Sequence, residues 1–289
     1  YRASLEWTDD DAAAHKVTGV TLPGLPIVVA GSNGKIAWGF TNAYADTGDV
    51  VVIEPNVISR SFYKFGDELV RFELREELIK VRGKEPVDFV VNWTRWGPVI
   101  GEGDKTRPLA YRWTAHLPDA VSLSLMGLET AANVTEALPI AQDAGMPAQN
   151  IIVVDQQGEM AWSIAGQLPR RVGYDGRFPV SRTYGDRYWD GVLSADEKPV
   201  LINPASGRLW TANNRIIGGE ALNLLGDGGY EKPARAARIR DRLFAMENAT
   251  PADMLALQLD DHAPSLNRWH ELLLATLTPE VVEGDRSLA

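Results

Sequence analysis

The chain contains no cysteine. This absence excludes disulfide bonds, cysteine-ligated structural zinc and a thiol nucleophile. The 289 residues include no run of 18 uncharged apolar residues, so the sequence predicts no membrane-spanning helix. Histidine is also scarce, and the spacing of the four, His15, His116, His262 and His270, points to no serine–histidine pair.

Basic residues are fewer than acidic ones. The sequence has 29 lysines and arginines against 39 aspartates and glutamates, which gives a formal net charge of −10. An acidic protein of this kind is a poor match for nucleic acid or for an anionic membrane surface. The same balance is typical of a well-solvated globular surface, and the 45% hydrophobic content is sufficient to form a core.

The first two-thirds of the chain is dominated by β-type patterns. Runs such as "KIAWGF", "VDFVVNW" and "IIVVDQQGEMAWSIAG" are β-branched or alternating, and Gly, Pro, Asn and Asp separate them. One helix is expected over residues 134–144, with Thr135 as its N-cap and Gly145 after its end.

Helical spacing appears in the last third. Ala236, Ile239, Leu243 and Met246 share one face of "KPARAARIRDRLFAMEN", and arginines occupy the other. A second helix is expected from Pro251, with Thr250 and Asp253 in a capping-box pattern, and a third over "SLNRWHELLLATL". Strands followed by helices predict an α+β fold.

Three short segments repeat one local pattern, in which a polar turn with glycine precedes a run that contains tryptophan. They are "SNGKIAW", "QQGEMAW" and "ASGRLW", and each is expected to form a β-hairpin, the first around a type I′ Asn-Gly turn. The repetition supports an alternative function, a β-rich, propeller-like binding module without catalytic activity. The uneven spacing of the three segments weighs against that alternative.

Ser32, in "GSNGKIAWGFTN", raises a second alternative. Gly-Ser-Asn resembles a junction at which self-cleaving amidases release a nucleophilic serine. However, an apolar strand precedes Ser32 and an alternating strand follows it, which predicts a turn, and the G-x-S-x-G pattern is absent. The turn is the favoured interpretation.

Several segments, in order, resemble the penicillin acylase family of N-terminal-nucleophile hydrolases, in the middle part of the β chain. They are "LPGLPIVVAGSNGKIAWGFTNAYADTGDVVVIEP", "NWTRWGPVI", "MPAQNIIVVDQQGEMAWSIAGQLPRR", "YWDGVL", "INPASGRLWTANNR" and "YEKPARAARIRDRL". The resemblance implies an αββα sandwich, partly represented here by two antiparallel sheets with flanking helices. It also implies hydrolysis of N-acyl amides, of the penicillin or N-acyl homoserine lactone type, through a serine acyl-enzyme. The amino group of that serine serves as its base, so no histidine is required.

The resemblance further implies that residues 1–289 are a single-domain fragment. The family's nucleophile lies several tens of residues before "PGLP", and the chain starts at Tyr1 without methionine. We therefore expect the nucleophile segment, the α chain and the C-terminal part of the β chain to be partners of this chain, and the isolated chain to be inactive. We expect exposed sheet edges and apolar faces that favour association. A periplasmic or extracellular location is implied by the family alone.

Three residues are implied as parts of the catalytic site. The resemblance assigns one oxyanion-hole donor to the backbone N–H of Asn42 and the other to the side-chain amide of Asn213, with Asn214 as the adjacent alternative. Arg235 matches an arginine that orients this asparagine. Position alone does not distinguish it from Arg238, Arg240 and Arg242 on the same expected helix, and a surface arginine is the alternative interpretation. A neutral carboxamide is a suitable donor because it does not titrate. Taken alone, "ANN" is more typical of a turn at a strand end, and without the resemblance the turn is the favoured interpretation.

Calcium is the implied metal. Asp46 and Asp49 lie three residues apart in a glycine-containing loop, and hard oxygen ligands suit Ca²⁺. The resemblance adds Pro179 and Asp227 as later ligands and a further one from the α chain. Two solvated loop acids are the alternative interpretation of Asp46 and Asp49.

Overall fold

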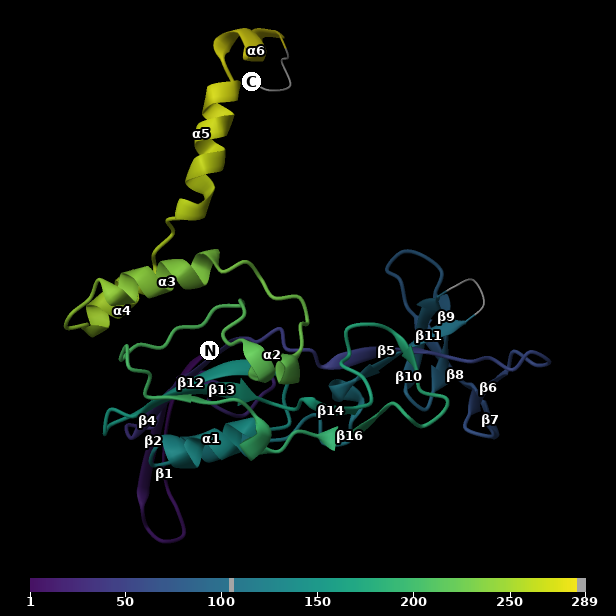
Figure 1. Cartoon of the computed structure of the whole chain (residues 1–289). Coiled ribbons are helices and arrows are strands. Elements are labelled where there is room, and N and C mark those ends of the chain that lie inside the picture. Colours follow the sequence, from purple (N-terminus) through teal and green to yellow (C-terminus); the bar gives the residue numbers. More distant parts are fainter. Residues whose placement is uncertain (104–106, 285–289) are drawn as a thin grey trace.

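A computed structural model describes residues 1–103 and 107–284 (Figure 1). Its larger sheet is antiparallel throughout and has seven strands in the order β1-β2-β3-β4-β12-β13-β17. In that order, the strands span Arg2–Thr8, Ala14–Val20, Ala30–Ser32, Ile36–Asn42, Gln149–Asp155, Met160–Ala165 and Leu201–Ile202. Strands that lie far apart in the sequence are neighbours in this sheet, since β12 pairs directly with β4.

Both faces of the central strands of this sheet are covered. On one face, helix α1 (Val134–Gln142) packs on alternate residues of β12, including Ile151 and Val153, and this cluster forms the main core. On the other face, Trp162, Ile164 and Leu225 belong to a second cluster. Because successive side chains of a strand point to opposite faces, alternate side chains of β12 and β13 enter different cores.

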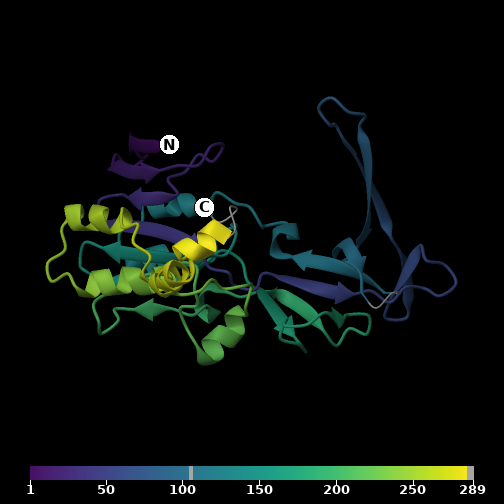
Figure 2. The same cartoon turned by 90° about the horizontal axis from the view of Figure 1, so that it is seen from above.

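The second sheet lies beside the first in both views (Figures 1 and 2). It has six strands in the order β15-β5-β11-β10-β9-β8, with the bounds Val180–Ser181, Gly48–Val52, Pro108–Trp113, Gly97–Glu102, Val87–Thr94 and Glu73–Ile79. β15 pairs in parallel with β5, so the expectation of two purely antiparallel sheets is wrong at this edge. Two small pairs complete the β-structure: β6 (Phe62–Phe65) with β7 (Glu68–Arg71), and β14 (Pro169–Val172) with β16 (Tyr188–Val192).

Helices over residues 234–244, 251–258 and 267–276 lie where the sequence predicts them, while the short helices over 219–225 and 279–284 were not predicted. They are α2 (Gly219–Leu225), α3 (Ala234–Phe244), α4 (Pro251–Gln258), α5 (Asn267–Thr276) and α6 (Pro279–Gly284). The capping box of Thr250 and Asp253 at α4 is confirmed. The expected cap of α1 is wrong: Asn133, not Thr135, accepts the hydrogen bond from the N–H of Glu136. Thus the α+β class is confirmed.

The tryptophan segments do not repeat one structure. Gly34 and Gly158 have positive φ in the β3–β4 and β12–β13 connections, as expected. Asn33 has negative φ, so the first turn is not type I′; its side chain instead accepts from the N–H groups of Lys35 and Ile36. "ASGRLW" turns at Gly207, but no strand of the described structure includes Trp210. The sheets form no radial array of blades, so the propeller alternative is wrong for the described residues.

Large apolar side chains are exposed in two places. The β8–β9 ribbon extends from the second sheet (Figure 2) and exposes Leu74, Leu78, Phe89 and Val90. Helix α5 projects from the body (Figure 1) and exposes Trp269 and three leucines, Leu272, Leu273 and Leu274. The expected exposed apolar faces are present, and association through them stays a prediction. In the described part of the chain, no helix combines the length and hydropathy needed to cross a membrane.

Candidate functional site

The three expected catalytic residues meet at the end of β4. Asn42 is the last residue of this strand, and its backbone carbonyl accepts a hydrogen bond from Nδ2 of Asn213 at 3.1 Å. Arg235, in the first turn of α3, donates from its guanidinium to Oδ1 of the same Asn213. The fold therefore joins a strand end, a loop and a helix start that lie far apart in sequence.

The contact with Arg235 fixes which way the Asn213 amide points. A guanidinium can only donate, so the amide oxygen must face Arg235 and the NH₂ group must face Asn42. The backbone carbonyl of Asn213 also accepts from the N–H of Glu231 at 2.9 Å. Asn214, the adjacent alternative, instead donates to the carbonyl of Arg215 at 2.8 Å. The structure therefore brings Asn213, and not Asn214, to the end of β4.

Asn150 is a residue of this site that the sequence analysis missed. Its side chain is buried, with 2% exposure, and its Nδ2 donates to Thr41 Oγ1 at 3.1 Å and to the Asn42 carbonyl at 3.3 Å. Its Oδ1 accepts from Nε1 of Trp162 at 3.0 Å. The available signal was a lone amide at the start of the apolar run "NIIVVD", since a buried amide in such a run requires partners.

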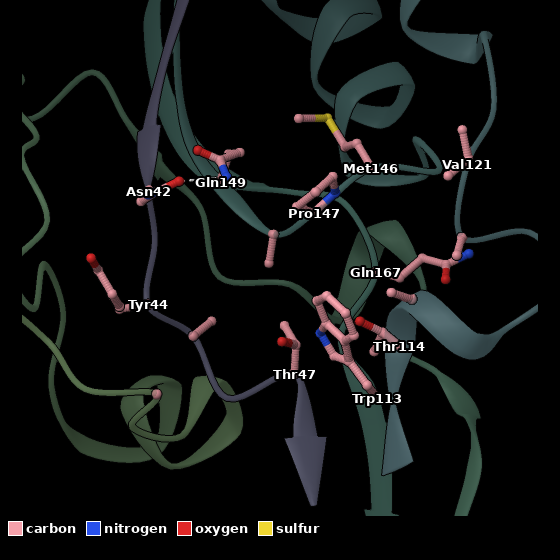
Figure 3. A pocket seen from close by; sticks show the side chains of 15 residues that line it. Asn42, Tyr44, Thr47, Trp113, Thr114, Val121, Met146, Pro147, Gln149 and Gln167 are labelled. Atoms are coloured by element: carbon pink, nitrogen blue, oxygen red, sulfur yellow. Dashed lines mark hydrogen bonds between the residues drawn. The ribbon is translucent and has the colours of Figure 1, made fainter. Parts of the chain in front are cut away.

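A cavity of about 410 Å³ opens beside Asn42 (Figure 3). Asn42 and Gln149, joined by a 2.9 Å hydrogen bond, form one wall, and Thr47 and Trp113 stand at the opposite side. Met146, Pro147 and Val121 contribute apolar surface. Of the described residues that line the cavity, none carries a charge. An uncharged, partly apolar cavity of this size suits a neutral organic group.

Asp49 lies at the centre of a buried ion-pair cluster. Its Oδ1 accepts from Arg171 Nε at 3.0 Å, and its Oδ2 accepts from Arg182 at 2.6 Å, from the Tyr174 hydroxyl at 2.5 Å and from Trp189 Nε1. Burial lowers the pKa of Arg182 to about 10, against the opposing effect of Asp49. The interpretation of Asp49 as a solvated loop acid is wrong, because its side chain is 2% exposed.

Asp46 shares an arginine with Asp49. Its Oδ2 lies 3.0 Å from Nη2 of Arg171, and burial, opposed by Arg171 and reinforced by Asp49, raises its pKa to about 6. The loop that carries Asp227 passes near Asp46, because the backbone N–H of Asp46 donates to the Leu225 carbonyl at 2.8 Å. The Asp227 carboxylate, however, accepts from two backbone N–H groups of its own loop.

The expected calcium ligands do not form a fitting donor set as arranged here. Pro179 is exposed and precedes β15, while Arg171 and Arg182 place positive charge directly on the carboxylates that a cation would need. Across residues 1–103 and 107–284, no three acidic or histidine side chains gather as a metal site. As arranged here, these residues therefore do not offer calcium a fitting site, and the calcium that the resemblance implies is decided by a calcium titration of the protein.

Ser32 has a structural role. Its hydroxyl donates to the Ile36 carbonyl at 2.7 Å and accepts from the Gly34 N–H at 3.0 Å. Both bonds close the turn between β3 and β4, in agreement with the favoured interpretation of this segment.

Comparisons with known proteins converge on one family. The family model for penicillin amidase matches residues 1–288. The chain is 27% identical over 260 residues to acyl-homoserine lactone acylase QuiP of Pseudomonas aeruginosa, covering 85% of this chain and 30% of that protein. It is 28% identical over 269 residues to penicillin acylase 2 proenzyme of Pseudomonas sp., covering 92% and 34%. It is 29% identical over 205 residues to penicillin G acylase of Escherichia coli, covering 70% and 24%.

A solved structure shares the fold. The thermostable penicillin G acylase of Alcaligenes faecalis superposes with a TM-score of 0.74 and 24% identity, over 96% of this chain and 51% of that one. The chain thus spans about a third of the length of the first two curated relatives.

Proposed function

The chain belongs to the penicillin amidase family, and from this we propose that it supplies the oxyanion-binding part of the active site of an N-acyl amide hydrolase. The observation that carries the proposal is the hydrogen-bonded series Arg235–Asn213–Asn42. The names of the relatives, acyl-homoserine lactone acylase and penicillin acylase, support acyl amides as the substrate class.

The proposed chemistry begins with a serine that lies outside this chain and attacks the amide carbonyl. Negative charge then develops on the carbonyl oxygen, and fixed donors lower the barrier. The Asn213 amide has two N–H groups: one is used by the Asn42 carbonyl, and the other remains for the oxyanion. The backbone N–H of Asn42 is the second proposed donor.

Arg235 and Asn150 hold these donors in place. Arg235 fixes the amide orientation of Asn213, and Asn150 ties the end of β4 to the loop that carries Asn213 through the Ala212 carbonyl, at 3.4 Å. The uncharged cavity beside Asn42 is the proposed place for the acyl group. The charge-free lining favours an acyl group without a charge of its own, because a buried unpaired charge is costly.

We propose that the complete protein is processed into two chains, as the term proenzyme in one relative's name suggests. The test is to determine the intact mass and N-terminal sequences of the natural gene product and to assay it with a chromogenic N-acyl amide. We expect a chain that begins with serine before Tyr1, and amide hydrolysis.

Two controls make this test specific. The Ser32→Ala variant should keep full activity, because Ser32 serves the turn. Residues 1–289 alone should be inactive. An unprocessed natural product without amidase activity would contradict the proposal, and so would loss of activity in a folded Ser32→Ala variant.

A further inference from the structure

A second cavity, of about 400 Å³, shares Trp113 with the first. Trp113 lines both cavities, Thr114 lines the uncharged one, and His116 lines the second. The second cavity has the opposite chemistry, because Arg75, Arg95 and Arg112 all contribute to its wall. This concentration of positive charge stands out in a chain whose net charge is −10.

Within the described residues, two of the three arginines have no carboxylate partner. Arg75 pairs with Glu73 at 2.9 Å. In the part of the chain that the structure describes, no ion pair is formed by Arg95 or Arg112; the guanidinium of Arg95 stacks on Phe65 at 3.6 Å, and that of Arg112 on Trp189 at 4.6 Å. Stacking on aromatic rings holds a guanidinium in place and leaves its N–H groups free to donate at its edge.

The nearest candidate counter-charge for Arg112 is already used. Strand register places Asp49 of β5 directly opposite Arg112 of β11. Asp49, however, already accepts from Arg171 and Arg182, and among the described residues no hydrogen bond or ion pair joins it to Arg112. Positive charge around this point therefore exceeds the negative charge.

The basic groups of the cavity also repel one another. Burial lowers the pKa of Arg112 against the opposing effect of Asp49, and Arg95 lowers it further. Burial, Arg75 and Arg112 together lower the pKa of His116. Like charges that converge on one cavity are stabilised by an anion placed between them.

Aromatic rings also line this cavity. Trp93 and Trp113 flank His116, with ring centroids 5.5 Å and 6.0 Å from its ring, and Trp96 lines the same cavity. Flat indole surfaces favour a flat apolar group as their neighbour. The cavity thus combines donors for a carboxylate with surfaces for a ring.

We propose that this cavity binds a carboxylate carried on a flat apolar group, with the carboxylate between Arg95 and Arg112 and the apolar group against Trp93 and Trp113. The proposal does not depend on the proposed hydrolase activity. The carboxylate can come from a free aromatic acid, or from an acidic side chain next to an aromatic residue in the remainder of the protein.

The experiment is calorimetric titration of the natural gene product with benzoate, with benzamide as the uncharged match. Arg95→Met removes one donor group and retains an aliphatic contact with Phe65, and Arg60→Met, on the exposed surface, is the control. We expect benzoate to bind, benzamide to bind roughly tenfold or more weakly, and Arg95→Met to weaken benzoate by a similar factor, as loss of a charge-assisted hydrogen bond requires. Arg60→Met should leave binding unchanged.

A thermal unfolding measurement distinguishes the two sources of the carboxylate. If a side chain of the protein occupies the cavity, benzoate will not bind, and Arg95→Met will lower the unfolding midpoint relative to Arg60→Met. If the cavity takes a free acid, benzoate will bind and Arg95→Met will not lower the midpoint. Absence of both benzoate binding and destabilisation overturns the proposal, and so does benzamide binding as tight as that of benzoate.

Discussion

Arg235 donates a hydrogen bond to Oδ1 of Asn213, 22 residues before it in the chain. The geometry leaves the Asn213 NH₂ group directed at the end of β4, where it contacts the Asn42 carbonyl. An asparagine side chain on a partly exposed loop is otherwise free to rotate by 180°, which would exchange donor and acceptor. The arginine therefore acts as a positioning residue in the proposed site.

This relationship predicts that Arg235→Gln lowers kcat of the natural protein about tenfold. KM should change little, because Arg235 makes no contact with the bound substrate in the ground state. In the Asn213→Ala background, the same substitution should cost almost nothing more, since its effect acts through Asn213. Arg240→Gln, on the same helix and paired with Asp241, is the matched control. Steady-state kinetics of the single and double variants measure this, and additive losses would contradict the positioning role.

Asn150 predicts a stability effect. Asn150→Leu should lower the free energy of unfolding by about 1–3 kcal/mol, because it leaves the buried Trp162 Nε1 and the Thr41 hydroxyl without this partner. Gln149→Leu, whose amide lies at the exposed rim, should cost less. Urea denaturation of the two variants gives the comparison, and equal effects would show that Asn150 is not a structural link.

The Asp49 cluster predicts stabilisation by ion pairs. Asp49→Asn leaves Arg171 and Arg182 with less counter-charge in a buried site and should lower the free energy of unfolding by about 3–5 kcal/mol, whereas the exposed Asp67→Asn should be near neutral.

Excess CaCl₂ should not raise the unfolding midpoint of the wild-type chain. A calcium-dependent rise that Asp46→Asn abolishes would instead establish the calcium site that the family resemblance implies.

Asp46 predicts a pH dependence. Its pKa is raised from 3.8 to about 6 in the folded protein, so between these values the folded state binds more protons than the unfolded state. Stability therefore falls as pH rises through this window, and the contribution of protonated Asp46 is fully present only below it. The unfolding midpoint of wild type relative to Asp46→Asn should decline over this range. A flat difference would contradict the raised pKa.

Local patterns allowed much of the fold to be predicted. The capping box at Thr250 and the turns at Gly34 and Gly158 depend on neighbouring residues, so the sequence contains the required information. The cap of α1 was misplaced because Asn133 and Thr135 are both good caps, and tertiary contacts select between them. The parallel β15–β5 pair joins short segments far apart in the chain, and no local pattern specifies it.

The residues of the candidate site also fall into those that the sequence revealed and those that it did not. Asn42, Asn213 and Arg235 could be identified only through resemblance, since each alone is compatible with a turn or a helix surface. Asn150 and Trp113 escaped attention because their importance arises from what surrounds them: Asn150 from burial beside Trp162, Trp113 from its place in the lining of two cavities. The arginines around Asp49 likewise come from segments more than a hundred residues away.

The most direct test of the account is the kcat of the natural protein with Asn213 replaced by alanine. Loss of an oxyanion donor should reduce kcat about 10²–10³-fold with little change in KM, while the fold, judged by the unfolding midpoint, is retained. The account predicts this loss for Asn213→Ala and not for the neighbouring Asn214→Ala. A folded Asn213→Ala variant with wild-type kcat would contradict the central claim that this amide stabilises the transition state.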